Sequence, residues 1–279
     1  MSYKGKQKHT KIKTNIKMSF YDEFDAIYVI SMPNDDIKYN NVVSEIEKTG
    51  IPHCKIERFY AVSKTYLSSL RQDCNFALTD GELGCTLSHL SVMALALKRH
   101  QNKILIFEDD AFVSRTKDVR MLCTDFIETV KDIEVNERKE WSILYFGHMP
   151  VKKNYIGNFM FADKNEIQMY LQGNKKNYFK TSDELRVYAT HAYAVSKHFM
   201  ENYIRSYFLY NQSEMNDQRT LNLFQNISHE YLVICTYPQI FYQPNNYSES
   251  SEKDRPYNEL YSGATADKEE SVELLLKSS

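Results

Sequence analysis

The chain has 279 residues, a formal net charge of −2 and a hydrophobic content of 42%. This length suits one large α/β domain or two small ones, and the near-zero charge argues against a protein that binds nucleic acid over a large surface. The five cysteines are scattered and form no CxxC pair, which predicts neither a disulfide framework nor a zinc site and favours a reducing compartment. Apolar runs are only a few residues long, so we expect a cytoplasmic protein without a signal peptide or transmembrane segment.

Composition divides the chain into three parts. Residues 1–20 predict a basic, disordered tail, because residues 1–18 hold six lysines and no acid. Residues 21–247 carry the hydrophobic patterns of a single folded domain. Residues 248–279 are rich in Ser, Glu and Lys, and predict a polar tail with a short helix near 267–277.

The folded part begins with a strand, a helix and a second strand. Residues 25–30 predict the first strand, and the Pro, Asn and Asp residues of 31–36 predict a turn after it. Residues 37–49 predict a helix that ends at Gly50, and 55–60 predict the next strand. This order is a βαβ unit, which implies a parallel sheet.

The next helix is predicted to begin after Thr79. Glu82, three residues later, completes the pattern of a capping box, and leucines at helical spacing follow. Gly84 lies inside this helix, where glycine costs about 1 kcal/mol relative to alanine. We therefore expect either another group that approaches the helix closely or tight packing on the sheet.

Four apolar residues at 104–107 are followed at once by Glu108, Asp109 and Asp110. The run predicts a strand buried on both faces, and ligands of open α/β sheets bind beyond the carboxyl ends of strands. Three acids at that position are costly unless a cation lies among them. Oxygen ligands suit Mg²⁺, Mn²⁺ or Ca²⁺, which predicts a cation that holds an anionic group such as a diphosphate. The alternative is an acidic run that marks the exit of the strand into water or caps a helix.

The remaining elements continue the alternation of strands and helices. Helices are predicted at 116–134, 197–209 and 215–225, and strands at 141–147, 187–195 and 231–235. Residues 151–185 are polar and poor in periodicity, and predict a long excursion with a hairpin or loops that shapes an acceptor site. Residues 238–244 predict an extended exit.

Three segments together resemble a known family. They are residues 78–90, which contain GELGCTLSH, residues 104–110, which end in FEDD, and residues 189–196, which read ATHAYAVS. In this order and at this spacing they resemble glycosyltransferase family 25, which includes bacterial lipopolysaccharide galactosyltransferases and collagen hydroxylysine glycosyltransferases. Weaker matches extend the resemblance over about residues 25–245.

The resemblance implies a GT-A fold, which is a Rossmann-like αβα sandwich with a mostly parallel central sheet. It implies that the acidic run is a DxD-type motif that binds Mn²⁺ (or Mg²⁺) and the diphosphate of a UDP-sugar. Asp110 is then the best metal ligand, with Glu108 beside it, and Glu108 and Asp109 contact the metal or the ribose. The chain departs from the family at Ser142, where Asp is usual, and at residues 31–33, which replace the common Asn-Leu.

The donor-binding residues implied by the resemblance also include Ser31, Glu82, Ser88 and His191. His191 lies in a strand that should border the cleft, where it either binds the diphosphate or the metal or is a structural histidine. Glu82 either points into the site or only completes the capping box. For His89, next to Ser88 on a buried helix, a structural role is the preferred interpretation.

The implied reaction inverts the sugar, because the acceptor hydroxyl attacks the anomeric carbon from the face opposite the departing UDP. A carboxylate takes the hydroxyl proton. Asp217, at the start of a predicted helix, is the candidate base. Its alternatives are an ordinary first-turn acid, favoured by the helix dipole, and a direct metal ligand.

The resemblance therefore implies a metal-dependent inverting glycosyltransferase that moves a hexose, galactose or glucose above all, from a UDP-sugar to a hydroxyl of a glycan or glycoprotein, with collagen-like proteins among the candidate acceptors. The alternatives are a non-catalytic nucleotide- or sugar-binding module and a sugar nucleotidyltransferase of similar fold. The nucleotidyltransferase usually needs a first loop rich in Gly and Arg, and residues 31–38 contain neither. A phosphohydrolase with paired aspartates is excluded, because Ala111 stands two residues after Asp109 where the second aspartate is required.

Overall fold

The computed structural model describes residues 19–63, 66–67, 79–115, 118–153, 159–173, 177–209, 231–243, 247–248 and 253–254. Three predictions lie outside the described residues: the basic tail over 1–18, the helix at 215–225 with Asp217, and the helix near 267–277. Within the described ranges, no helix combines the length and the apolar character needed to cross a membrane.

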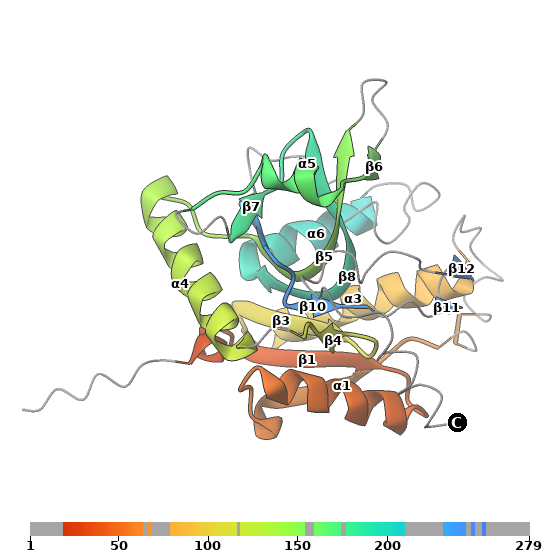
Figure 1. The fold of residues 1–279 in the computed structure, drawn as a ribbon. Coiled ribbons are helices and arrows are strands. Elements are labelled where there is room, and N and C mark those ends of the chain that lie inside the picture. The colour runs from red at the N-terminus through yellow and green to blue at the C-terminus, as the bar shows by residue number, and fades with distance from the viewer. Residues whose placement is uncertain are drawn as a thin grey trace, which may run out of the picture.

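An eight-stranded mixed sheet forms the centre of the described structure (Figure 1). In spatial order its strands are β2 (Ile56–Tyr60), β1 (Ala26–Ser31), β3 (Lys103–Glu108), β8 (Leu185–Ser196), β5 (Ile143–Lys153), β9 (Val233–Thr236) and β7 (Tyr178–Lys180), with β6 (Phe159–Phe161) paired to β5. β1 is parallel to β2 and β3, β5 is parallel to β9, and β8 is antiparallel to both β3 and β5. Five of the eight strands therefore share one direction, which confirms the predicted mostly parallel sheet.

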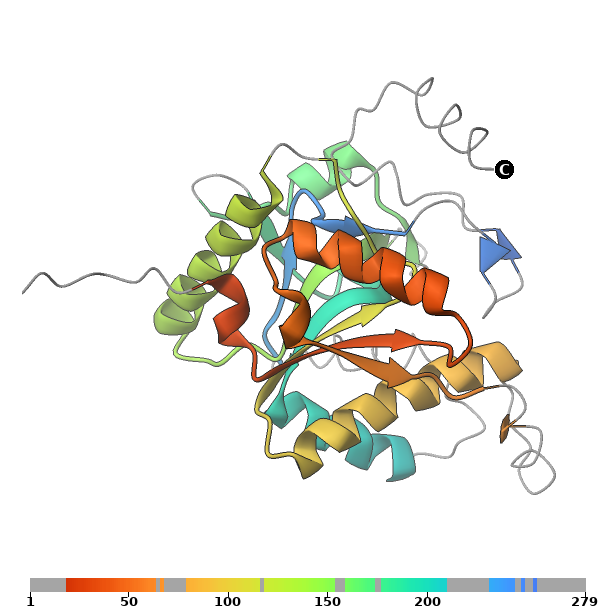
Figure 2. The same cartoon turned by 90° about the horizontal axis from the view of Figure 1, so that it is seen from below.

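Helices cover both faces of this sheet (Figures 1 and 2). They are η1 (Phe20–Glu23), α1 (Asp36–Lys48), η2 (His53–Lys55), α3 (Asp80–Lys98), α4 (Val119–Glu137), α5 (Lys164–Gln168) and α6 (Lys197–Leu209). α3 and α6 lie together on one face, and α1 and α4 lie on the other (Figure 2). Met93 and Phe199 belong to the first hydrophobic core, and Ile46 and Phe126 to the second. The predicted Rossmann-like αβα sandwich is confirmed.

The first βαβ unit forms as its sequence predicts. The side chain of Asp35 caps α1 by accepting a hydrogen bond of 3.0 Å from the Lys38 backbone. The helix buries Val42 and Ile46 against the sheet. Gly50 then adopts a φ of 95°, a left-handed conformation that glycine adopts without steric cost, so the predicted stop acts through the backbone.

The second long helix, α3, begins with the predicted capping box. Thr79 Oγ1 accepts from the Glu82 backbone at 3.2 Å, and Glu82 Oε2 accepts from the Thr79 backbone at 2.9 Å. A Cβ on Gly84 would lie 2.8 Å from the carbonyl oxygen of Val62. One turn later, Ser88 Oγ accepts a hydrogen bond of 2.8 Å from the Val62 backbone. The group that approaches α3 closely is therefore the chain that leaves β2.

The first and last residues of the polar excursion predicted over 151–185 are part of the central sheet. β5 continues to Lys153, β6 pairs antiparallel with it, and β8 begins at Leu185. The pairing of β5 with β8 shifts register on both sides of Gly147, and Ala189 in β8 has a φ of 77°. Such irregularities bend a strand and change which side chains face a given side.

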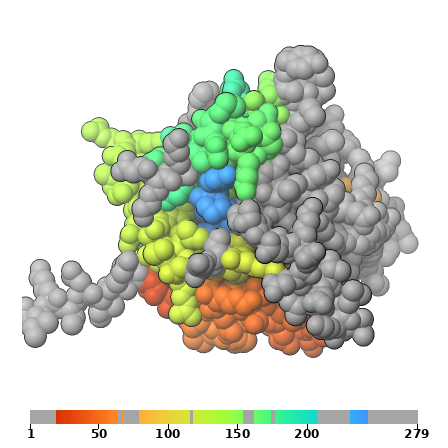
Figure 3. All heavy atoms as spheres, viewed as in Figure 1, coloured from red at the N-terminus to blue at the C-terminus, as the bar shows by residue number. Residues whose placement is uncertain are grey.

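A short strand late in the chain returns to the acidic run. β10 (Phe241–Tyr242) pairs antiparallel with β4 (Phe112–Val113), which follows the acids directly. The predicted extended exit is therefore a strand paired beside the acids. In Figure 3 residues 231–243 show only a small blue patch between green and yellow-green atoms, in keeping with the burial of Phe241. β11 (Tyr247–Ser248) pairs antiparallel with β12 (Lys253–Asp254) in a separate two-stranded sheet.

Candidate functional site

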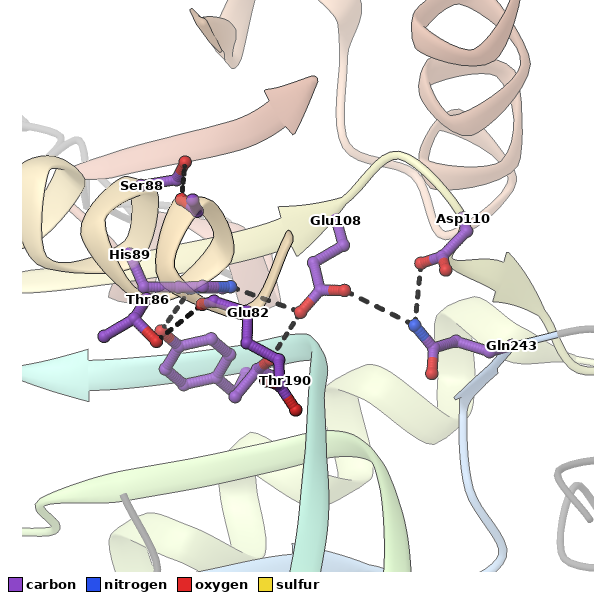
Figure 4. Close-up of polar contacts among 10 residues, drawn as sticks. Glu82, Thr86, Ser88, His89, Glu108, Asp110, Thr190 and Gln243 are labelled. Carbon is purple, nitrogen blue, oxygen red and sulfur yellow. Dashed lines mark hydrogen bonds and ion pairs between the residues drawn. The ribbon is translucent and has the colours of Figure 1, made fainter. Parts of the chain in front are cut away.

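The acidic run at the end of β3 divides between two directions. Glu108 and Asp110 turn toward the same partner, Gln243, which follows β10 (Figure 4). Gln243 Nε2 lies 2.8 Å from Asp110 Oδ1 and 3.4 Å from Glu108 Oε2. The amide N–H groups therefore donate to both carboxylates from a buried position. We call Glu108, Asp110 and Gln243 the acidic cluster.

Glu108 is also held by α3 and β8. Its Oε1 accepts a hydrogen bond from the Thr190 hydroxyl and lies 3.2 Å from His89 Nε2 (Figure 4). His89 Nδ1 lies 2.8 Å from the Tyr193 hydroxyl. Burial raises the pKa of Tyr193 well above its usual value, so this hydroxyl stays protonated and can either donate to Nδ1 or accept from it. The Glu108 side chain, 17% exposed, is thus oriented while it keeps contact with solvent.

Asp109 turns instead toward the loop between β1 and α1. Its carboxylate lies near the side chain of Ser31 and the ammonium group of Lys38, and both favour the ionised form. Burial raises the pKa of Asp109, and Lys38 and Ser31 oppose part of that rise. The parallel register pairs Ile30 with Glu108, so Ser31 and Asp109 follow as neighbours. The sequence prediction that both residues belong to one site therefore has a geometric basis.

Arg58 of β2 supports the same loop. Its Nη2 donates to the Met32 carbonyl at 2.8 Å, and its Nη1 forms an ion pair with Asp36. The guanidinium carbon lies 4.5 Å from the ring centroid of Tyr39 and 5.1 Å from that of Tyr60, within the range of cation–π attraction. The loop has no arginine of its own, but it receives one from the neighbouring strand.

His191 lies beneath β10 rather than beside the carboxylates. Its ring is completely buried, and its Nε2 is 3.3 Å from the carbonyl oxygen of Phe241. A Cβ on Gly147 would lie only 2.1 Å from this Nε2, so the glycine leaves room for the ring. Thr190 is the residue of β8 that contacts Glu108. The strand therefore presents Thr190, and not His191, to the acidic cluster.

The other predicted site residues are not brought to the acidic cluster. Ser88 forms its hydrogen bond with the backbone of Val62, and Glu82 uses its carboxylate in the capping box with Thr79. Asp217 lies outside the described residues. The described site is thus smaller than the predicted one, with Ser31, Asp109 and the acidic cluster at its centre.

The comparison with known families decides the membership of the chain. The profile of glycosyltransferase family 25, whose description is an LPS biosynthesis protein, matches residues 6–218, which is well over half of the chain. This protein belongs to glycosyltransferase family 25. A Haemophilus influenzae protein assigned as a glycosyltransferase is 34% identical over 91 residues. That match covers 30% of this chain and 31% of the relative, so the chain aligns with about a third of that relative's length.

Three solved structures share a distant likeness with this family 25 chain. A 4-diphosphocytidyl-2C-methyl-D-erythritol synthase from Anaerococcus prevotii has a TM-score of 0.35 at 10% identity, over 77% of this chain and 71% of that one. A mannose-1-phosphate geranyltransferase from Thermus thermophilus has a TM-score of 0.38 at 9% identity, over 77% and 74%. A UDP-glucose pyrophosphorylase complexed with UDP-glucose has a TM-score of 0.40 at 8% identity, over 78% and 92%. Likeness at this level says nothing about the activity of the chain.

Three residues of the family 25 site were missed or undervalued by sequence reasoning. Gln243 follows a short apolar run, as the acids follow β3, but that segment gave only a weak match to the family. Thr190 stands next to His191 in the third family segment, and the choice between them depends on the irregular backbone at Ala189. His89, interpreted as structural, contacts Glu108 directly. These contacts depend on pairings between distant strands, for which the sequence holds no local signal.

Ser142, where the chain departs from the family pattern, has a structural position. Its buried hydroxyl accepts a hydrogen bond of 3.3 Å from the Leu232 backbone and so joins β5 to the segment that enters β9. This contact lies just before the two strands begin, and Ser142 is not among the groups that contact the acidic cluster in the described structure.

Proposed function

We propose that this family 25 protein transfers a hexose from a UDP-sugar to a hydroxyl group of a glycan or glycoprotein, with a divalent cation at the acidic cluster. The observation that supports the proposal most directly is the Gln243 amide between Glu108 and Asp110. N–H donors between two carboxylates mark a position that favours positive charge. A divalent cation satisfies the same two carboxylates with more charge than an amide dipole can supply.

The donor set fits Mn²⁺ or Mg²⁺. Glu108 and Asp110 offer carboxylate oxygens, the ligands that hard divalent cations prefer. When bound, such a cation would neutralise the charge that develops on the departing diphosphate. Asp109, on the β1 side of the same turn, is our proposed contact to the metal or the ribose, with galactose or glucose as the transferred sugar.

The chain's own groups hold this site in place. Thr190 and His89 orient Glu108, and Arg58 fixes the loop that follows β1. Attack by the acceptor hydroxyl from the face opposite the diphosphate would invert the anomeric carbon. Asp217 stays our proposed base for the hydroxyl proton.

The test is UDP release from UDP-galactose, UDP-glucose and UDP-N-acetylglucosamine, with and without Mn²⁺ and with a mixture of glycan acceptors. We expect release from one donor only when the cation is present. Asp110→Ala should slow it by about a thousandfold, because the change removes a charged ligand from the site. Asp132→Ala, on the exposed face of α4, is the matched control and should release UDP at the native rate.

Each rival function has its own result in the same experiment. Full release by Asp110→Ala would contradict the placement of the cation at the acidic cluster. Formation of UTP from a UDP-sugar and pyrophosphate would instead indicate a nucleotidyltransferase. Cation-dependent thermal stabilisation by UDP, without release from any donor, would indicate a binding module.

A further inference from the structure

We propose that Cys85, His89 and Glu108 form a second cation site, suited to Zn²⁺, next to the acidic cluster. Among the described residues, one ligand atom from each of these three side chains lies within 4.8 Å of the other two. Cys85 and His89 stand four residues apart on α3, which places them on the same face of the helix. Glu108 comes from the end of β3 and faces them.

The spacing of these atoms matches a small metal shell. His89 Nε2 and Glu108 Oε1 are 3.2 Å apart. In a tetrahedral zinc site, metal–ligand distances of roughly 2.0–2.3 Å hold the ligand atoms about 3–4 Å from one another. The separations in this group are at most 4.8 Å, so the three ligand atoms would have to move inward by about 1 Å or less to reach this range.

The chemistry of the three ligands selects the ion. A thiolate and an imidazole favour Zn²⁺, whereas Mn²⁺ and Mg²⁺ prefer an all-oxygen set such as Glu108 with Asp110. Cys85 is partly exposed and His89 is buried, so an ion can enter from the side of the thiol. Three protein ligands also leave the fourth tetrahedral position for a water molecule or a substrate.

The surrounding hydrogen bonds suit a metal-binding histidine. His89 Nδ1 faces the Tyr193 hydroxyl at 2.8 Å, and a hydroxyl either donates or accepts. When Nε2 binds zinc, the ring proton is on Nδ1, and Nδ1–H donates a hydrogen bond to the Tyr193 oxygen. A supporting acceptor of this kind is common at zinc-bound histidines. The Cys85 thiol loses its proton to solvent on binding, so each zinc ion releases one proton.

Zinc at this site would withdraw Glu108 from the acidic cluster. A carboxylate that binds Zn²⁺ beside His89 is less available to a cation beside Asp110. Zinc should therefore inhibit the transfer reaction in competition with Mn²⁺. This consequence rests on the proposed function, whereas the binding of zinc to the three side chains does not.

The test is metal binding by the full chain without any substrate. Competition with a chromophoric chelator measures zinc affinity, and Co²⁺ substitution reports a sulfur ligand through its thiolate charge-transfer band. We expect Cys85→Ser to weaken zinc binding by at least about a hundredfold, more than the loss of a supporting hydrogen bond would cause, and to abolish the Co²⁺ band. Tyr193→Phe should weaken binding about tenfold with the band retained.

The matched control is Cys54→Ser, which removes an exposed thiol that also stands next to a histidine. Its zinc affinity and Co²⁺ band should equal those of the native chain. Equal zinc affinity in native and Cys85→Ser protein, or a native chain without the band, would overturn the site. Because Ser is close to Cys in size, we expect Cys85→Ser to fold normally. A melting temperature equal to that of the native chain without metal would show this. Zinc binding without UDP release from any donor would leave this site standing and count only against the proposed transferase.

Discussion

The two halves of the sheet contribute to the acidic cluster in different ways. In the early half, made of β2, β1 and β3, the parallel registers run without interruption and place Ser31 at the end of β1 and Asp109 directly after β3. In the late half, made of β8, β5 and β9, the register shifts around Gly147 and Ala189 holds a left-handed backbone. The regular half supplies the carboxylates, whereas Thr190 of the irregular half helps to hold Glu108.

The largest difference in stability is expected between alanine substitutions at Gly147, in the late half, and at Gly84, on the helix that packs against the early half. In Gly147→Ala the new Cβ would meet His191 Nε2 at 2.1 Å and the Phe241 carbonyl at 2.7 Å, both buried beneath β10. We expect the free energy of unfolding to fall by at least about 3 kcal/mol in urea denaturation. Gly84→Ala in the early half meets the Val62 carbonyl at 2.8 Å, but alanine also favours the helix by about 1 kcal/mol, so its loss should be smaller.

A double variant sharpens this comparison. Removing the ring in Gly147→Ala/His191→Ala gives the new methyl group room, so the double variant should be more stable than the sum of the two single changes predicts. Additive losses would mean that the ring does not fill the space over Gly147. Equal losses for Gly147→Ala and Gly84→Ala would remove the proposed difference between the halves.

His148 in β5 should make the late half sensitive to acid. Burial lowers its pKa from 6.5 to about 4, although its bond to the Thr236 carbonyl favours the charged form. A depressed histidine pKa adds stability above pH 6.5 that is lost as pH falls toward 4, by about 3 kcal/mol in total. His148→Gln cannot take up this proton, so its unfolding free energy should fall less over the same range. Parallel pH profiles for the two proteins would contradict this origin of acid sensitivity.

Thr190 tests the support that the late half gives to Glu108. Thr190→Val keeps the shape of the side chain but removes the hydrogen bond to the carboxylate. A hydrogen bond to a charged group contributes about 1.5–3 kcal/mol, so kcat/KM for UDP-sugar should fall roughly tenfold or more. Thr129→Val removes a similar hydroxyl on α4, which bonds to the Asp125 carbonyl, and should leave kcat/KM unchanged. Equal kinetics for both variants would show that Glu108 needs no support from β8.

The smallest effect is expected from Asp109 in the early half. Because burial raises its pKa, the ionised carboxylate costs stability at neutral pH. Asp109→Asn should therefore raise the free energy of unfolding at pH 7 by up to about 1 kcal/mol, while it lowers the proposed activity. A folded-state aspartate usually has a lowered pKa and stabilises the protein when ionised, whereas the raised pKa of Asp109 makes ionisation destabilising. The stability gained in Asp109→Asn should therefore shrink as pH falls toward 3.8, the ordinary pKa of the group. A variant less stable than the native protein at pH 7 would contradict the burial cost.

The sequence predicted the early half well because its signals are local. Periodicity, the Thr79 capping box and Gly50 each act within a few residues, and their elements begin and end close to the predicted residues. The late half was harder, because the contact of Glu108 with Gln243 joins residues 135 apart. The spacing of Cys85 and His89, one helical turn apart, is visible in the sequence, but their neighbour Glu108 lies on β3, and only the whole fold brings that strand beside α3.

The position of Gln243 has a consequence for biosynthesis. The ribosome makes Glu108 and Asp110 long before Gln243, which follows Glu108 by 135 residues. At about 5–20 residues per second, translation of that interval takes roughly 7 to 27 seconds. During this time the nascent chain can fold its first βαβ unit while the two carboxylates still lack the amide that later joins them. A message truncated before codon 243 would therefore yield a chain that has both carboxylates of the cluster but lacks the Gln243 amide that contacts them.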